Sequence, residues 1–183
     1  MKKFISLLAT SLVLILATSN ASAIPITGVI NFTGGATVTH TPTEVTAVAF
    51  NNTFANLSDT LVTGDFNGLE GVAASFTDIN VAAPTPYSLW TIGGFTFQIT
   101  SIIQNSFGSI PGLGLNFALL GGNGIISSTN SAFEDTQGTW TITANGNSDE
   151  MSFSSTAVPS PAGTALLGLA LLGFGFARRN KQA

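Results

Sequence analysis

The stretch Thr139-Trp140-Thr141-Ile142-Thr143-Ala144 decides the fold class, because polar and apolar side chains alternate along it without a break. A period of two places the tryptophan, the isoleucine and the alanine on one face and the threonines on the other, as a half-buried β-strand requires. A second alternating segment, Glu150 to Ser154, has Met151 and Phe153 as its apolar members. Asn145-Gly146 between the two segments favours a hairpin turn, although the gap is longer than a two-residue turn needs. The sequence therefore predicts two antiparallel strands joined by a loop.

The same period recurs on the N-terminal side of this hairpin. Phe95-Thr96-Phe97-Gln98-Ile99-Thr100 alternates strictly, and glycine, asparagine and proline separate the other candidate strands. Gly34-Gly35 predicts a hairpin turn, and Ala82 to Pro86 and Ser106 to Gly114 predict longer turns. The further strands expected are Val29–Thr33, Ala36–Thr39, Val45–Phe50, Val72–Thr77, Leu89–Ile92, Leu115–Leu120 and Ile125–Ser128.

The body from Ile24 to Ala157 is predicted to be all-β. Threonine, valine, isoleucine and phenylalanine favour strands and are frequent there, whereas the strong helix formers lysine, arginine, glutamate and glutamine are scarce. About nine to eleven short strands indicate an antiparallel β-sandwich or a partly open barrel. A body of roughly 135 residues is long enough for one domain with its own core.

The charged residues are segregated along the chain. The five basic residues lie at the two ends, and all nine acidic residues lie between them. This interior carries −9 with His40 neutral, and a body without lysine or arginine cannot neutralise phosphates. The composition therefore argues against nucleic-acid binding and against a phosphate-binding P-loop. The absence of cysteine excludes disulfides, thiolate metal sites and cysteine nucleophiles.

Residues 1–23 have the three parts of a secretory signal peptide. Lys2-Lys3 is the positive region, Phe4 to Ala17 is the apolar region, and Ala21-Ser22-Ala23 offers the small residues that signal peptidase recognises. Cleavage after Ala23 would make Ile24 the first residue of the mature protein. The alternative is an uncleaved membrane anchor, but the apolar region is shorter than the ~20 residues that a span prefers.

Residues 158–183 form a second predicted address. Val158-Pro159-Ser160-Pro161 breaks the preceding strand, Ala162 to Ala177 is uncharged and apolar, and Arg178-Arg179-Asn180-Lys181 is a basic tail. As a helix the apolar run would reach about 24 Å, a small deficit against the ~30 Å hydrocarbon core that local thinning covers. The positive-inside rule places the tail in the cytoplasm. The alternative, a buried core helix, lacks the amphipathic pattern expected of it.

This ending resembles the PEP-CTERM sorting signal of Gram-negative bacteria. The resemblance covers about 26 residues and rests on Val158, Pro159, Ser160 and Pro161, on the leucine-rich run, and on the pair Arg178-Arg179. It implies processing near the Pro-x-Pro motif by an exosortase, an integral-membrane transpeptidase-like enzyme, and association with exopolysaccharide or biofilm matrix. The family usually has glutamate at the position of Ser160, which leaves the enzyme subtype and the cleavage itself open. The body, through Gly28 to Ala36 and Gly138 to Gly146, is similar to small PEP-CTERM proteins for which the resemblance implies no activity.

Residues that could carry chemistry are few. His40 is the single histidine and lies in no nucleophile motif, so a solvated loop histidine is the favoured interpretation. The acidic pairs Glu134-Asp135 and Asp149-Glu150, and the segment Asp65-Phe66-Asn67-Gly68, offer oxygen ligands for weak calcium binding but match no complete calcium loop. A glycosidase carboxylate pair is defined by distance rather than by spacing, so the sequence leaves it open.

Two features suggest binding. Alternating threonines, Thr37 to Thr43 and Thr139 to Thr143, resemble the rows of ice-binding surfaces, but no repeat of fixed period brings further rows into register. Tyr87 and Trp90 lie beside two prolines, and a role in capping the core is the favoured interpretation, with stacking on sugar rings as the alternative.

Taken together, the sequence predicts an exported protein without enzymatic activity and without a required cofactor. It would be anchored transiently in the inner membrane and destined for the cell surface or the extracellular matrix. Signal peptidase, an exosortase-type enzyme and the membrane are the expected partners, with exopolysaccharide implied by the resemblance. A calcium-, carbohydrate- or ice-binding β module is the main alternative, and a surface hydrolase is a second one.

Overall fold

The computed structural model describes residues 23–110, 115–145 and 150–158. The predicted signal peptide up to residue 22 and the sorting signal from residue 159 onward, with their expected helices, lie outside the described residues. The described chain contains eleven strands and one short 3-10 helix, η1, at Gly64–Phe66. The strands are β1 Ile24–Pro25, β2 Val29–His40, β3 Val45–Ala55, β4 Ser75–Phe76, β5 Ile79–Asn80, β6 Tyr87–Ile92, β7 Phe95–Ile110, β8 Leu115–Ser128, β9 Phe133–Glu134, β10 Thr136–Asn145 and β11 Glu150–Ala157.

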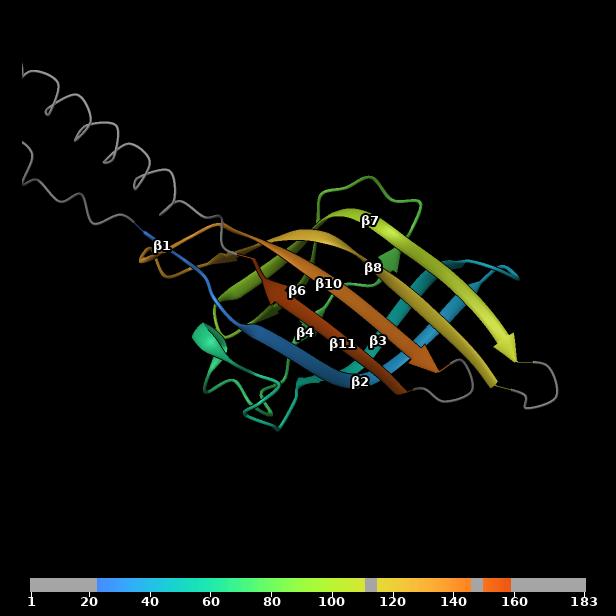
Figure 1. Cartoon of the computed structure of the whole chain (residues 1–183), viewed down its shortest axis with the longest axis horizontal. Coiled ribbons are helices and arrows are strands. Elements are labelled where there is room, and N and C mark those ends of the chain that lie inside the picture. Colours follow the sequence, from blue (N-terminus) through green and yellow to red (C-terminus); the bar gives the residue numbers. More distant parts are fainter. Residues whose placement is uncertain (1–22, 111–114, 146–149, 159–183) are drawn as a thin grey trace, which may run out of the picture.

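Nine of these strands form one antiparallel sheet that curls around the core (Figure 1). The order across the sheet is β4-β6-β7-β8-β10-β11-β2-β3-β5, and the small strands β1 and β9 form a separate parallel pair. The prediction of an all-β, mainly antiparallel fold is therefore confirmed. A single curled sheet is closer to the half-open barrel than to the two stacked sheets of a sandwich.

One segment, residues 71–81, links the two edges of the curled sheet. At its ends it bonds to β3: Ala55 N–H donates to Val72 O at 2.9 Å, and Val81 N–H donates to Thr46 O at 3.1 Å. In its middle it turns to β6, where Ser75 and Phe76 pair with Thr91 and Trp90. The edges of β3 and β6 are therefore both occupied along this segment, which limits unpaired strand edge.

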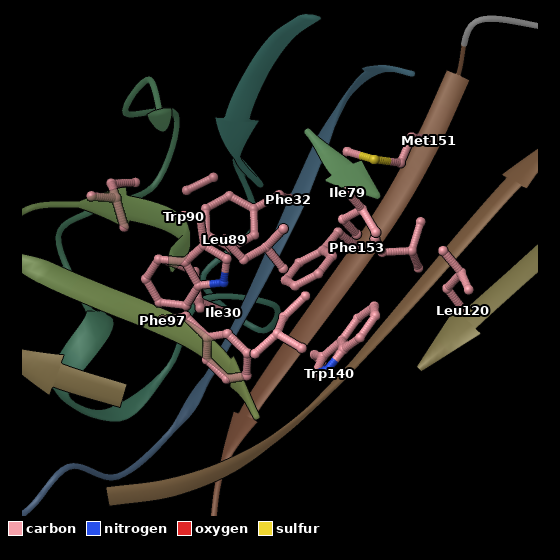
Figure 2. Packing of buried hydrophobic residues seen from close by; sticks show 14 of the residues in the cluster. Ile30, Phe32, Ile79, Leu89, Trp90, Phe97, Leu120, Trp140, Met151 and Phe153 are labelled. Atoms are coloured by element: carbon pink, nitrogen blue, oxygen red, sulfur yellow. The ribbon is translucent and has the colours of Figure 1, made fainter. Parts of the chain in front are cut away.

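The core contains aliphatic side chains and a cluster of aromatic rings (Figure 2). Phe153 packs against Phe32 at 5.6 Å between ring centroids, and Phe32 packs against Trp90 at 5.2 Å. Trp90 stacks on Phe97 at 5.6 Å, so four strands contribute to one continuous series of ring contacts. The alternation predicted for the last hairpin is confirmed, because its inward residues are all buried: Trp140, Ile142, Ala144, Met151 and Phe153.

The predicted hairpin turn at Gly34-Gly35 is wrong. Strand β2 runs through both glycines, with an irregular register against β3 between Thr33 and Gly35. The glycine is needed for close packing rather than for a turn: a Cβ on Gly34 would lie 2.8 Å from Asn52 O and 2.9 Å from Thr53 Cα. A glycine pair inside an alternating strand thus marks a bulge here, which the sequence pattern alone does not distinguish from a turn.

Two other predicted boundaries are also corrected. The strand predicted to end at Thr100 continues as β7 to Ile110, so most of the turn expected at Ser106 to Gly114 is strand. The separate strands expected at Leu115–Leu120 and Ile125–Ser128 are one strand, β8. Glycines inside β8 leave room for large inward rings, because a Cβ on Gly124 would overlap the ring of Phe97. The turn predicted at Ala82 to Pro86 is confirmed as the connection between β5 and β6.

Candidate functional site

The outer side of the sheet over β8, β10, β11 and β2 carries uncharged polar side chains in register. Pairing of β10 with β11 sets Thr143 opposite Ser152 and Thr141 opposite Ser154, and β2 continues these rows with Thr33 and Asn31. A third row contains Thr139 and Thr156, with Asn123 of β8 opposite Thr139. We call this surface the neutral polar face, and its members are Asn31, Thr33, Asn123, Thr139, Thr141, Thr143, Ser152, Ser154 and Thr156.

The neutral polar face is a two-dimensional array. Neighbouring strands lie about 4.8 Å apart and alternate residues along a strand about 6.7 Å apart, so its polar groups recur at regular intervals in two directions. Within the part of the chain that the structure describes, none of its side chains forms a hydrogen bond to another residue. Except for Asn31 Oδ1, which is buried, their donors and acceptors are therefore available to an external partner or to water.

A shallow groove of about 390 Å³ lies beside this face, above Gly121 of β8. Gln104 of β7 and Thr141 of β10 both pair with Gly121, one from each side. Strand β7 is irregular on either side of this point, with register shifts between Ile99 and Ser101 and between Ile102 and Gln104. The residues that line the groove are Ile103, Gln104, Gly121, Gly122, Asn123, Thr139, Trp140 and Thr141.

The groove is polar but uncharged. Gln104, Asn123, Thr139 and Thr141 are exposed and supply amide and hydroxyl groups, whereas Ile103 is 71% exposed and supplies an apolar surface. Gln104 and Gly121 were not singled out from the sequence. The only sequence signal for the groove is the glycine run Gly121-Gly122 inside a strand, a position that often marks close backbone approach.

None of the acidic side chains that the structure describes is a member of the neutral polar face: Glu134 lies in β9, Asp65 lies in η1, and the others lie in turns and connections. The described acidic residues are Glu44, Asp59, Asp65, Glu70, Asp78, Glu134 and Asp135. Asp149 and the side chain of Glu150 lie outside the described residues, although the position of Glu150 begins β11 beyond Ser152. The face itself therefore contains no described charge in a body that carries nine acids.

Of the carboxylates considered for calcium, Asp65 has a structural partner. Asp65 Oδ2 accepts hydrogen bonds from Thr27 N–H at 2.7 Å and from Thr27 Oγ1 at 3.0 Å, which holds the entry to β2. Glu70 Oε1 accepts a hydrogen bond from Gly68 N–H at 3.2 Å. Among the described residues, no three acidic or histidine side chains gather in a way that would hold a metal ion.

His40 lies at the end of β2, where its ring stacks on Phe107 with centroids 3.4 Å apart and planes at 11°. Its Nδ1 lies 2.8 Å from Thr41 O, and the residue is exposed. The row of threonines expected at Thr37 to Thr43 ends here: Thr37 and Thr39 lie on β2, whereas Thr41 Oγ1 accepts the Glu44 N–H at 3.0 Å within the turn. His40 thus packs on an aromatic ring next to the β2–β3 turn, and Thr41 stabilises that turn.

Of the two alternatives for Trp90, the structure supports packing in the core and not contact with a sugar. Trp90 is only 1% exposed, because strand β6 turns it into the aromatic core between Phe32 and Phe97. Tyr87 is partly buried, and its hydroxyl has no hydrogen-bond partner among the described residues. This burial raises the pKa of the Tyr87 hydroxyl above its usual value.

Of the predicted targeting residues, only two are described. Ala23 precedes β1, and Val158 follows β11, 49% exposed, with its N–H donating to Gln137 O at 2.7 Å. Ala21, Pro159, Ser160, Pro161, Arg178 and Arg179 lie outside the described residues. In the described part of the chain, no helix has the length and apolar character needed to cross a membrane.

Comparisons with protein-family models, with curated proteins and with solved structures found no match.

Proposed function

We propose that this protein is an exported cell-surface or extracellular-matrix protein without catalytic activity. In this proposal, signal peptidase releases the body at Ile24, the segment Ala162 to Ala177 anchors it transiently in the inner membrane, and an exosortase-type enzyme acts at Val158 to Pro161. The observation that carries the proposal is the position of the two ends of the β body.

Both ends of the body meet one short stretch of chain, residues 132–137. At the N-terminal end, Ile24 N–H donates to Ala132 O at 2.9 Å, and Ile26 N–H donates to Thr136 Oγ1 at 2.8 Å. At the C-terminal end, the Val158 N–H donates to Gln137 O at 2.7 Å. The coloured chain accordingly begins and ends at the same end of the sheet (Figure 1).

This arrangement suits a body that is anchored from one end. A membrane segment after Val158 would hold that end next to the bilayer, and the long strands would project away from it. At about 3.3 Å per residue, the 16 residues of β7 extend up to roughly 50 Å. The neutral polar face lies along these strands and would be presented to the surroundings of the cell.

The absence of a catalytic role remains part of the proposal. It is supported by the environments of the titratable groups, since His40 packs on Phe107 and Asp65 holds Thr27. A binding-module function is favoured by a separate observation, the in-register rows of the neutral polar face. The two functions are compatible, because a matrix protein needs a surface with which to contact the matrix.

Intact-mass measurement of the protein from its native host tests the proposal at both ends. We expect a mature N-terminus at Ile24 and, after sorting, loss of the mass that follows the Pro-Ser-Pro motif. A host strain without the exosortase-type enzyme should retain the full C-terminus in its membranes. Recovery of a chain that still begins at Met1 and remains in the cytoplasm would contradict export and with it the whole proposal.

A further inference from the structure

The groove above Gly121 brings polar groups from three strands to one point. Gln104 Oε1 and Thr141 Oγ1 lie 3.4 Å and 3.5 Å from the position that a Cβ on Gly121 would take, and Trp140 O lies 3.0 Å from it. The groove therefore exists because residue 121 has no side chain. Two side chains that are separated by 37 positions in the sequence converge on the space that remains.

The chemistry of the groove selects the class of ligand. Amides and hydroxyls both donate and accept hydrogen bonds, which suits a ligand that has many hydroxyl groups. No described lysine or arginine lines the groove, which argues against binding of a polyanion. No described acidic side chain lines it either, which argues against binding of a cation. Ile103 adds an exposed apolar surface against which the C–H face of a sugar ring can pack. A neutral carbohydrate satisfies each of these features.

The surroundings of the groove indicate an extended ligand rather than a single sugar. The row that crosses the groove runs from Gln104 over Gly121 and Thr141 to Ser154 and Asn31, across five strands. The rows on either side repeat uncharged polar groups on β10 and β11 at the strand periodicity, although one of them ends at Leu119 of β8 and the other at Val29 of β2. A ligand with repeating hydroxyl groups that extends beyond the groove would thus be able to form hydrogen bonds with these neighbouring rows.

We propose that the groove above Gly121 and the adjoining neutral polar face bind a neutral polysaccharide chain. Gln104 and Thr141 provide the central contacts, and Ile103 packs against a sugar ring. Ice is the other ordered hydroxyl-rich partner that such rows would fit. The groove and the curl of the sheet favour a flexible chain over a flat crystal surface. The binding site lies wholly in the β body and does not depend on how the protein is sorted.

Affinity electrophoresis tests this proposal with the full chain in lauryldimethylamine oxide, a detergent without sugar groups. The native gels would contain amylose, dextran, mixed-linkage β-glucan, xylan or galactomannan, with alginate as the polyanionic comparison. The test variant is Gln104→Ala/Thr141→Ala. Its matched control is Gln98→Ala/Thr91→Ala, which removes an exposed glutamine from the same strand and an exposed threonine from β6, away from the groove.

We expect at least one neutral polysaccharide to retard the wild-type protein and the control variant, whereas alginate does not. The groove variant should bind that polysaccharide about tenfold more weakly, since two hydrogen-bonding groups are lost. Circular dichroism should show the same strand content in all three proteins. No retardation by any neutral polysaccharide, or equal retardation of both double variants, would overturn the proposal. Inhibition of ice recrystallisation that the groove variant alone loses would assign the face to ice instead.

Discussion

The side chain of Asn105 acts as a strand partner for Val45. The Val45 N–H donates to Asn105 Oδ1 at 2.9 Å, and Asn105 Nδ2 donates to Val45 O at 3.0 Å. Val45 begins β3 and Asn105 lies in β7, so one amide joins two strands that are not neighbours in the sheet. The adjacent Phe107 N–H donates to Thr43 O at 2.8 Å, which strengthens the same contact. The β2–β3 turn thereby fixes the curl of the sheet at this end.

Replacing Asn105 by alanine should destabilise the fold by about 1–3 kcal/mol, because both backbone groups of buried Val45 would lose their partner. Asn105→Asp should also destabilise, since its second oxygen would face the Val45 carbonyl oxygen. Urea unfolding followed by tryptophan fluorescence measures both effects. The exposed residue Gln98 on the same strand provides the control, and Gln98→Ala should change stability by less than about 0.5 kcal/mol. Equal stability of all variants would show that the amide contact does not hold this end together.

The aromatic core gives a second prediction. Phe153 is fully buried and contacts the rings of Phe32, Phe76 and Trp140. Phe153→Ala should lower the free energy of unfolding by about 3–5 kcal/mol through lost burial and the cavity that it leaves. The matched control is Phe54→Ala on the exposed side of β3, where 43% of the residue is already accessible to solvent. If Phe54→Ala lowered the free energy of unfolding as much as Phe153→Ala does, Phe153 would not be a central core residue.

Alkaline pH should destabilise the protein through Tyr87. Burial raises the pKa of its hydroxyl in the folded state, so above about pH 10 the unfolded chain releases a proton that the folded chain retains. Stability should therefore fall as the pH rises through this range. Tyr87→Phe should remove this part of the pH dependence and cost little stability at neutral pH, because the hydroxyl has no partner among the described residues.

Tyr87 is the single tyrosine of the chain, which makes its titration directly observable. Tyrosinate absorbance of the folded protein should appear at higher pH than that of the protein in urea. Urea midpoints measured at several pH values should decline for the wild type but not for Tyr87→Phe. Coincident titration curves for the folded and unfolded protein would contradict the burial of this hydroxyl.

The proposed membrane anchor yields a fourth prediction. Replacing both Leu169 and Leu172 by aspartate should release the protein from membranes, since each central charge costs roughly 2.5–3.5 kcal/mol on insertion scales. Leu169→Ile/Leu172→Ile keeps the apolar character and should stay membrane-bound. Fractionation with an alkaline wash, in a host that lacks the exosortase-type enzyme, distinguishes the two variants. An aspartate variant that still pellets with membranes would mean that residues 162–177 are not the anchor.

The parts of the fold that could be predicted from the sequence were those with local periodicity. Trp140, Ile142 and Phe153 alternate with polar residues, and the structure buries all three. Gly34 was misinterpreted because a glycine in a turn and a glycine against Asn52 leave the same local signal. These two environments differ only in what lies opposite, which depends on long-range pairing.

The candidate groove was beyond prediction for a related reason. Gln104, Gly121 and Thr141 come from three strands, and their registers depend on irregularities in β7 that nothing local in the sequence marks. The threonines of β10 were recognised as a row, but a row becomes an array only when β11 and β2 add theirs in register. Without a repeat of fixed period, the sequence offered no means to align these segments.

A final prediction concerns association between copies of the body. Strand β7 pairs with β6 only from Phe95 to Ile99, and among the described residues no strand forms a hydrogen bond to that side again before Asn105 meets Val45. Ile103 lies in this uncovered stretch and is 71% exposed. Exposed strand edges are often guarded by lysine, which this body lacks, so its acids must provide the repulsion between copies.

Acidification should therefore cause self-association of a protein comprising residues 24–158, once circular dichroism has shown that it folds. Acid lowers the net negative charge of the body, and millimolar calcium would screen or bridge its acidic groups at neutral pH. Light scattering should show monomers at neutral pH in monovalent salt and larger species under both other conditions. Ile103→Lys, which places a lysine on the open edge, should suppress association at pH 4, whereas Leu57→Lys, an equal charge on an exposed connection, should suppress it less. A monomer at pH 4 and in calcium, or equal effects of the two lysines, would show that the β7 edge does not drive assembly.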